Sequence, residues 1–329
     1  MQAIGLGPHG ERPFPADKLV LSDPEAESAR AGRFAMAVVL HTTTSDWSRQ
    51  ELAGIVATLE HHDATILEIV DCRFDKDRQN KELLRLANAP IDAVISLPIG
   101  TSGVLEGHRA VVKAGKKLVL LDNAPSGLRP GVDYLSVSSA DNFGIGAIAA
   151  ELTSPHVPNE GVVGILNYES EFFVTNEREI GFRKWMGAER PDATLVRGRF
   201  ASVEEAGAAY ERLLAMNDDL DCVFVAWDVP ALRVLATIRD GARTLPIVTV
   251  DLGDEIAKEL RKGGPLKGIA AQRPFDQGAA AASAALMGLV GRSPPGWITS
   301  EGLKVTRENL DAACDVLWRK PAPPPLQSG

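Results

Sequence analysis

The chain has 329 residues, of which 45% are hydrophobic and 24% are charged, so it can bury the core of one or two ordinary domains. Its 35 basic and 44 acidic residues give a net charge of −9, which argues against nucleic acid or an anionic membrane surface as a partner. No stretch approaches the roughly 20 apolar residues of a transmembrane helix. The first residues lack the pattern of a signal peptide, so we expect either a cytosolic protein or a chain whose export signal has been removed.

The two ends of the chain look irregular. Residues 1–32 are rich in Pro, Gly, Ala and Glu without a sustained period, and we expect an extended arm or tether there. Residues 319–329 are predicted to form a disordered tail. The three cysteines, Cys72, Cys222 and Cys314, contain no CxxC pair that would suggest a zinc or redox site. We expect buried free thiols, because two of them lie in or beside apolar runs.

From residue 33 onwards, short apolar runs alternate with segments of helical periodicity. Leu52, Ile55 and Leu59, for example, fall on one face of a helix predicted over 47–59. Strands are predicted over 34–40, 65–70, 93–97, 117–121 and 135–137. Further helices are predicted around 82–87 and over 104–114.

The same alternation starts again near residue 162. Strands are predicted over 162–166, 194–200, 222–226, 246–250 and 268–271, and helices over 175–186, 203–216, 231–240, 255–262 and 277–290. Apolar runs that do not alternate in polarity indicate strands buried on both faces, as in parallel sheets covered by helices. We therefore predict an α/β fold of two doubly wound parallel-sheet lobes, with a ligand bound in a shared cleft at the carboxyl ends of the strands.

Polar and aromatic side chains follow several predicted strands. Asp46 and Trp47 lie in the first such loop, where Thr44 or Asp46 is also a candidate N-cap of the next helix. Asp122 and Asn123 follow the fourth strand, where turn chemistry is an alternative explanation. The second half adds a helical arginine and several strand-end side chains, namely Arg178, Trp227, Asp228, Asp251 and Gln272.

These side chains favour a neutral polyhydroxylated ligand. Carboxylates and amides bond to vicinal hydroxyls, and aromatic faces pack on the C–H side of a sugar or polyol. An anion would need more cations than Arg178 and Arg273. No GxSxG, GxxxxGK[ST] or HExxH motif is present, and the literal GxGxxG at residues 5–10 precedes every predicted strand. Gly144 and Gly146 fit a looser GxGxxA pattern, which close packing at a helix start explains. We expect no enzymatic activity, cofactor or metal.

An ordered set of motifs resembles the type I periplasmic solute-binding proteins of the ribose-binding kind, which are the receptors of sugar ABC transporters. The resemblance covers residues 33–318 and rests on LHTTTSDW, LVLLDNAP, SSADNFGIGAIAA, NEREIGF, VFVAWDVPALRVL, IVTVDL and GIAAQRPFDQG. It implies three crossovers that form a hinge, and closure of the lobes around the ligand. The implied N-terminal lobe comprises 33–138 plus 274–298, and the implied C-terminal lobe comprises 139–272 plus 299–318.

The resemblance also implies which residues contact the ligand. Carried over by position, they are Asp46, Trp47, Asp122, Asn123, Arg178, Phe200, Trp227, Asp251 and Gln272, with Asp228 as a neighbour. Trp227 stands where ribose-binding members commonly have Asn, and Val250 stands where they commonly have an aromatic residue. These departures change the expected shape of the site. Because two indoles take up space there, we expect a small ligand such as a tetritol, a pentitol or a pentose.

Family membership would make the protein a monomeric receptor in the periplasm, or otherwise outside the cytoplasm. Residues 1–32 would then be a lipid-anchored tether whose signal is absent from this sequence, and the partners would be an ABC permease and ATPase. A sensory receptor for a chemoreceptor or kinase is an alternative that the sequence leaves open. The effector domain of a transcriptional regulator would need a DNA-binding helix-turn-helix, which residues 1–32 are too short and too poor in basic residues to supply. A two-lobed α/β enzyme is disfavoured, because no nucleophile or cofactor loop is recognisable.

Overall fold

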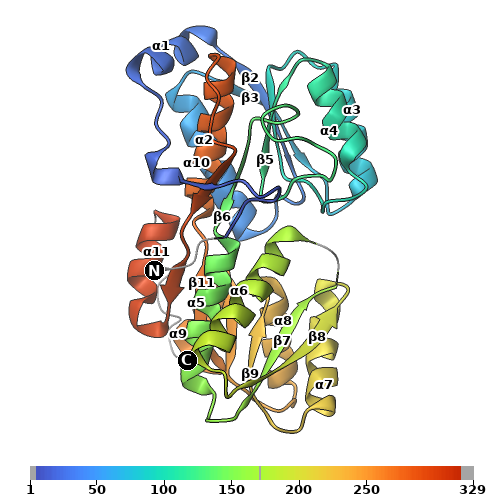
Figure 1. Cartoon of the computed structure of the whole chain (residues 1–329), viewed down its shortest axis with the longest axis vertical. Coiled ribbons are helices and arrows are strands. Elements are labelled where there is room, and N and C mark those ends of the chain that lie inside the picture. Colours follow the sequence, from blue (N-terminus) through green and yellow to red (C-terminus); the bar gives the residue numbers. More distant parts are fainter. Residues whose placement is uncertain (1–4, 170–171, 320–329) are drawn as a thin grey trace. The chain divides into compact units, whose positions relative to one another are not determined.

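The computed structural model describes residues 5–169 and 172–319 (Figure 1). The described chain forms two compact units, each assembled from segments that are distant in sequence. The N-terminal unit comprises Leu6–Ala140 and Arg273–Ser300, and the C-terminal unit comprises Gly5 and the described parts of 141–272 and 301–319. Each unit has a mainly parallel sheet with helices, which confirms the predicted fold class. The predicted tail lies outside the described residues apart from Arg319.

A seven-stranded parallel sheet forms the centre of the N-terminal unit, in the order β1-β12-β6-β5-β4-β2-β3. Its strands are β1 (Pro13–Pro15), β2 (Ala35–Leu40), β3 (Thr65–Asp71), β4 (Ala93–Ser96), β5 (Lys117–Leu121), β6 (Ser136–Ala140) and β12 (Trp297–Ser300). Strands β2, β4 and β5 are buried over almost their whole length. This burial explains why their sequences are continuous apolar runs instead of alternating patterns.

Helices cover both faces of this sheet (Figure 1). They are α1 (Asp23–Gly32), α2 (Asp46–His61), α3 (Lys76–Ala87), α4 (Leu105–Lys113) and α10 (Pro274–Leu289), with the short 3-10 helix η1 (Ala16–Lys18). Leu83 of α3 and Val111 of α4 pack with strand residues in one apolar core. None of the helices in the described part of the chain is both long and apolar enough to cross a membrane.

Helices α2 and α10 pack closely on each other because each has a glycine at the contact. A Cβ atom added to Gly54 of α2 would lie 2.0 Å from the backbone oxygen of Phe275. A Cβ atom added to Gly278 of α10 would lie 2.0 Å from the backbone oxygen of Glu51. Neither position tolerates a side chain without separating the two helices.

The C-terminal unit has a six-stranded sheet in the order β13-β11-β10-β9-β7-β8, parallel except for the β11–β13 pair. Its strands are β7 (Val162–Tyr168), β8 (Thr194–Phe200), β9 (Leu220–Val225), β10 (Ile247–Val250), β11 (Leu266–Ala271) and β13 (Leu303–Val305). Its helices are α5 (Asn142–Thr153), α6 (Phe173–Glu189), α7 (Ala206–Met216), α8 (Asp228–Arg239), α9 (Asp254–Lys262) and α11 (Leu310–Trp318), with the 3-10 helices η2 (Ser154–His156), η3 (Val203–Glu205) and η4 (Arg307–Asn309).

Helices α5 and α6 approach each other through the same kind of contact. A Cβ atom at Gly146 of α5 would lie 2.0 Å from the backbone oxygen of Arg178, and one at Gly181 of α6 would lie 2.0 Å from that of Phe143. This close contact is the packing role that the sequence predicts for Gly146. The contact also fixes the backbone of Arg178 against α5.

Both sheets are doubly wound. The strand order changes direction between β2 and β4 in the N-terminal unit, and between β7 and β9 in the C-terminal unit. Ligands of such sheets bind at the carboxyl ends of the strands next to this switch point. The loops after β2, β4, β7 and β9 are therefore the places where a binding site is expected, and β5 and β10 are the next strands in the two sheets.

The segment before β2 is folded, which differs from the extended arm that the sequence predicts. Strand β1 pairs in parallel with β12 at the edge of the sheet. The Glu25 side chain accepts a hydrogen bond from the Ser22 N–H at the start of α1 (2.7 Å), and Glu11 accepts one from the Tyr134 hydroxyl (2.8 Å). Backbone pairing and isolated polar contacts hold this segment, so it shows no apolar periodicity in the sequence.

Deleting residues 1–15 should lower the melting temperature of the free protein by several degrees. Strand β12 would lose its edge partner and the Tyr134 hydroxyl would lose its acceptor, and a lost hydrogen bond to a charged group costs about 1.5–3 kcal/mol. Thermal denaturation followed by circular dichroism measures the effect, with Tyr134→Phe as a variant that removes the side-chain contact alone. An unchanged melting temperature would show that the segment adds no stability.

Candidate ligand-binding site

Three of the predicted site residues form a buried polar network in the C-terminal unit. The Arg178 side chain, on α6, is 4% exposed, and its Nη1 lies 3.7 Å from Oδ2 of Asp251. Gln272 donates a hydrogen bond from Nε2 to Oδ1 of the same carboxylate (2.6 Å). Asp251 directly follows β10 and has a φ of +69°, a left-handed conformation that turns the chain out of the sheet.

The charge of Asp251 depends on this network. Burial raises the pKa of Asp251 above its usual range, while the Arg178 guanidinium and the Gln272 amide act in the opposite direction. Arg178 is held in turn by two further acceptors, the Oδ1 of Asn142 (2.9 Å) and the backbone oxygen of Ala226 (3.1 Å). The network therefore presents a fixed carboxylate, a guanidinium and an amide, which together can accept and donate hydrogen bonds to hydroxyl groups.

Aromatic rings gather at the ends of β7, β8 and β9. The ring centroid of Trp227 lies 5.3 Å from that of Phe200 and 5.7 Å from that of Tyr168, with the Tyr168 ring nearly perpendicular. Phe200 is only 1% exposed, so the cluster reaches the surface through Trp227 and Tyr168, which are partly buried. Asp228 follows Trp227 directly and is the first residue of α8. The cluster provides an apolar surface of tilted rings beside the polar network, because Trp227 follows Ala226, whose backbone oxygen binds Arg178.

In the N-terminal unit, Asp122 and Asn123 follow β5. Both are buried, and Asp122 has a φ of +56°. The Asn123 amide donates a hydrogen bond to the backbone oxygen of Pro98 (3.3 Å), while its Oδ1 has no hydrogen-bond partner among the described residues. Asp122 is tied to β6 through its backbone N–H, which donates to the Ser138 oxygen (3.0 Å).

Asp46 and Trp47 are the first two residues of α2. Asp46 forms an ion pair with Arg49 of the same helix. The sequence offers Thr44 or Asp46 as the N-cap of this helix, but the N-cap in the structure is Ser45. The Ser45 hydroxyl accepts a hydrogen bond from the Ser48 N–H (3.1 Å). The two predicted caps are excluded because Thr44 lies one residue before the cap and Asp46 lies inside the helix.

The Trp47 ring is part of a second aromatic group. His41, at the end of β2, lies with its ring centroid 5.9 Å from that of Trp47 and 4.7 Å from that of Phe74. Burial lowers the pKa of His41 to about 4, although Asp71 acts in the opposite direction. His41 is therefore uncharged at neutral pH and places a neutral imidazole ring next to Trp47.

Sequence reasoning did not name several residues that the structure places in these groups. Tyr168 was missed because the predicted strand 162–166 stops two residues short of the end of β7. Asn142 lies in the SSADNFGIGAIAA segment, but its bond to Arg178 joins elements 36 residues apart and leaves no local signal. His41 directly follows the first apolar strand, so the strand-end rule could have found it.

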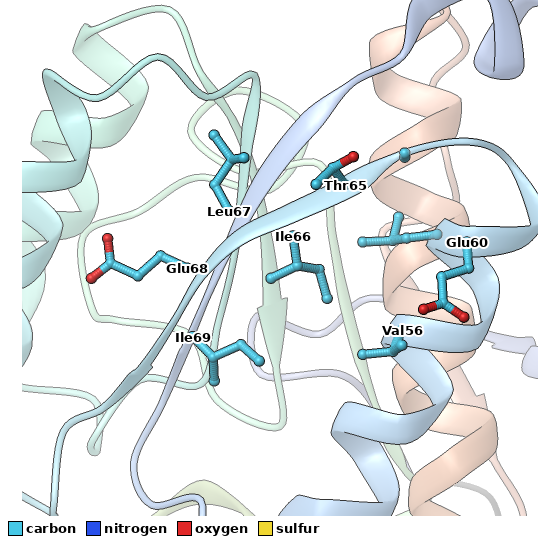
Figure 2. A pocket seen from close by; sticks show the side chains of 9 residues that line it. Val56, Glu60, Thr65, Ile66, Leu67, Glu68 and Ile69 are labelled. Atoms are coloured by element: carbon cyan, nitrogen blue, oxygen red, sulfur yellow. The ribbon is translucent and has the colours of Figure 1, made fainter.

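A separate pocket lies beside the edge strand β3 (Figure 2). It is lined by Val56 and Glu60 of α2 and by strand residues 65–69. Leu67 and Ile69 are exposed on this strand, which pairs only with β2 in the described sheet. No predicted ligand-binding residue lines this pocket, so it is not part of the candidate site.

Comparison with known proteins identifies a family and a fold. Residues 36–293 match the family described as periplasmic binding protein domain. No curated protein sequence is significantly similar to this chain.

Solved structures of ABC transporter solute-binding proteins are similar to the chain. One from Agrobacterium vitis, bound with α-D-tagatopyranose, has a TM-score of 0.79 and 22% identity over 88% of this chain and 99% of that chain. One from Mycobacterium smegmatis, with bound glycerol, has a TM-score of 0.76 and 21% identity over 85% and 96%. A carbohydrate transporter protein from Agrobacterium radiobacter, in complex with D-arabinose, has a TM-score of 0.75 and 19% identity over 87% and 98%. At these identities the likeness shows a shared fold.

Proposed function

Because this chain belongs to the periplasmic binding protein domain family, we propose that it is the solute-binding receptor of an ABC transporter and binds a neutral sugar or polyol. The observation that carries the proposal is the network of Arg178, Asp251 and Gln272, which lies next to the Trp227 aromatic cluster at the carboxyl ends of neighbouring strands. Charged and amide groups bond to hydroxyls, and an indole face packs on C–H groups. A sugar or polyol offers both surfaces at once.

Each unit carries its own set of proposed ligand-binding residues. In the C-terminal unit they are Arg178, Phe200, Trp227, Asp228, Asp251 and Gln272, and in the N-terminal unit they are Asp46, Trp47, Asp122 and Asn123. Similar proteins of this fold were solved with a ketohexose, a pentose and a triol, which supports a small polyhydroxylated solute as the class. Because two indoles take up space, the proposed ligand is a tetritol, a pentitol or a pentose.

The rest of the proposal concerns the setting of this receptor. We propose that it works outside the cytoplasm and releases an unaltered solute to a permease driven by an ATPase. The family is one of binding proteins, and the described site brings together hydrogen-bonding groups without a nucleophile paired to a base. Recovering the solute chemically changed after incubation with the protein would contradict this part.

A thermal-shift screen tests the proposed ligand class. We expect at least one of D-arabinose, D-ribose, D-tagatose, erythritol, xylitol and allitol to raise the melting temperature, whereas amino acids and nucleotides should not. A ligand at 100 times its dissociation constant adds about 2.7 kcal/mol of stability, and for a chain of this size each kcal/mol raises the melting temperature by roughly 2 °C. Stabilisation by amino acids or nucleotides alone would refute the sugar assignment and leave the family assignment intact.

A further inference from the structure

Glu51 and Arg178 occupy equivalent positions in the two units. The backbone oxygen of each faces a glycine of the neighbouring helix, and each is followed three residues later by the glycine that makes the reciprocal contact. The sheets show the same equivalence. The order β3-β2-β4-β5 in the N-terminal unit corresponds to β8-β7-β9-β10 in the C-terminal unit, so β5 and β10 hold the same place. Each of these strands is followed by an aspartate in the left-handed region, Asp122 with a φ of +56° and Asp251 with a φ of +69°. Glu51 and Asp122 therefore hold the places in the N-terminal unit that Arg178 and Asp251 hold in the C-terminal unit.

The surroundings of Glu51 are unusual for an acidic residue. Its side chain is 0% exposed, and neither carboxyl oxygen has a hydrogen-bond partner within residues 5–169 and 172–319. A buried carboxylate without donors is costly, and a protonated carboxyl is much less so. Burial raises the pKa of Glu51 well above its usual range, and the negative charge of Asp122 raises it further. Both effects favour the protonated form of Glu51.

Backbone contacts connect the helix pair to Asp122. Glu51 contacts α10 at Gly278, and the preceding residue, Gln277, accepts a hydrogen bond at its backbone oxygen from the Ser138 hydroxyl (2.8 Å). The backbone oxygen of Ser138 accepts the N–H of Asp122 (3.0 Å). The position of Asp122 relative to α2 is thus fixed through α10 and β6.

The charged groups at the starts of α2 and α10 and at the end of β3 are engaged with partners of their own. Asp46 pairs with Arg49 at the start of α2, and Arg273 lies 3.9 Å from Asp276 at the start of α10. Asp71, at the end of β3, acts on His41 and accepts a hydrogen bond from Thr43 (3.1 Å). Asp122 is the charge that affects the pKa of Glu51.

We propose that Glu51 is a positioning residue that supports Asp122 for ligand binding in the N-terminal unit, as Arg178 supports Asp251 in the C-terminal unit. This inference rests on the proposed function. The protonated carboxyl presents an O–H dipole to the carboxylate of Asp122, which favours the charged form of Asp122 and its role as a hydroxyl acceptor. The pair then carries one negative charge, which suits a neutral solute. Loss of the Glu51 proton would place two like charges together and weaken the binding of that solute.

The first test needs no ligand. A carboxyl whose pKa is raised on folding binds more protons in the folded state, so its contribution to the free energy of unfolding falls as the pH rises above its usual value of 4.5. Urea denaturation of the wild type between pH 5 and 9 should show this fall, and Glu51→Gln should remove it because the amide cannot ionise. Glu60→Gln is the matched control, since Glu60 is an exposed residue of the same helix. Identical pH profiles for the wild type and Glu51→Gln would overturn the proposal.

The second test measures affinity by calorimetry with D-arabinose, D-tagatose and xylitol as probes. The wild type should lose affinity at high pH. Glu51→Gln keeps a hydrogen-bond donor, so it should bind like the wild type at pH 7 and show no loss of affinity at high pH. Glu51→Leu removes the dipole and should weaken binding about tenfold. Wild-type affinity and pH dependence in Glu51→Leu would overturn this inference alone. Failure of all three probes with the wild-type protein would instead count against the proposed function, and with it against a ligand role for Glu51.

Discussion

Asp251→Ala is expected to abolish ligand binding and also to destabilise the free protein. The carboxylate accepts the Gln272 amide at 2.6 Å and faces the Arg178 guanidinium at 3.7 Å, so its removal takes away a ligand acceptor and leaves a buried cation without its counter-charge. Breaking a buried ion pair at one partner costs about 3–5 kcal/mol. From the sequence alone we expect the free protein to keep nearly its full melting temperature, unless Asp251 is a structural cap. The observed ion pair changes that expectation.

Isothermal calorimetry and urea denaturation separate the two effects of this substitution. Asp251→Asn keeps an oxygen that can accept the Gln272 amide and removes only the charge, so we expect it to be more stable than Asp251→Ala and still at least about 100-fold weaker in ligand affinity than the wild type. Glu255→Ala is the control, because Glu255 is an exposed residue of α9 that pairs with Lys258 at the surface and should change neither quantity much. Ligand affinity close to that of the wild type in Asp251→Ala would refute the assigned role.

Trp227→Ala should weaken ligand binding by about tenfold to 100-fold with a smaller effect on the free protein. A buried aromatic contact contributes roughly 1.5–3 kcal/mol through the apolar area that it removes from water. Trp227 is partly buried and contacts Phe200 and Tyr168 at the rim of the core. Its loss therefore reduces the aromatic surface and leaves no cavity in the buried core.

Trp227→Phe distinguishes a stacking role from simple packing. Phenylalanine retains an apolar ring face, so we expect it to recover most of the affinity that Trp227→Ala loses. Trp185→Ala removes an indole from α6 at a site outside the cluster and should leave affinity unchanged. Equal affinities for the wild type and Trp227→Ala, measured by calorimetry with the strongest hit of the sugar screen, would exclude Trp227 from the binding surface.

The sequence by itself determined the α/β class and most of the central strands. Strands β2, β4, β5, β9 and β10 are buried on both faces, and burial on both faces requires continuous apolar runs that can be read without a structure. The positions of Asp122 and Asp251 followed from the same rule, because a polar residue directly after such a run lies at the carboxyl end of a strand. Local pattern was sufficient for these features.

Elements that are held by backbone pairing or by a few contacts could not be predicted from apolar runs in the sequence. Strands β1, β12 and β13 are only three or four residues long, and helix α1 buries only Ala29. Such segments have too few apolar positions to show a period. Their structure depends on partners far away in the sequence, as when β1 pairs with β12.

The tertiary structure alone decided how the site residues act on one another. Arg178 meets Asp251 and Ala226 across 73 and 48 positions of sequence, and Glu51 acts on Asp122 across 71, so no local window contains either relationship. The charge states follow from the same cause, since burial and a neighbouring charge set the pKa of Glu51 and neither exists until the chain has folded. The sequence determined which chemical groups stand at the strand ends, and the fold determined which of them are paired, buried or protonated.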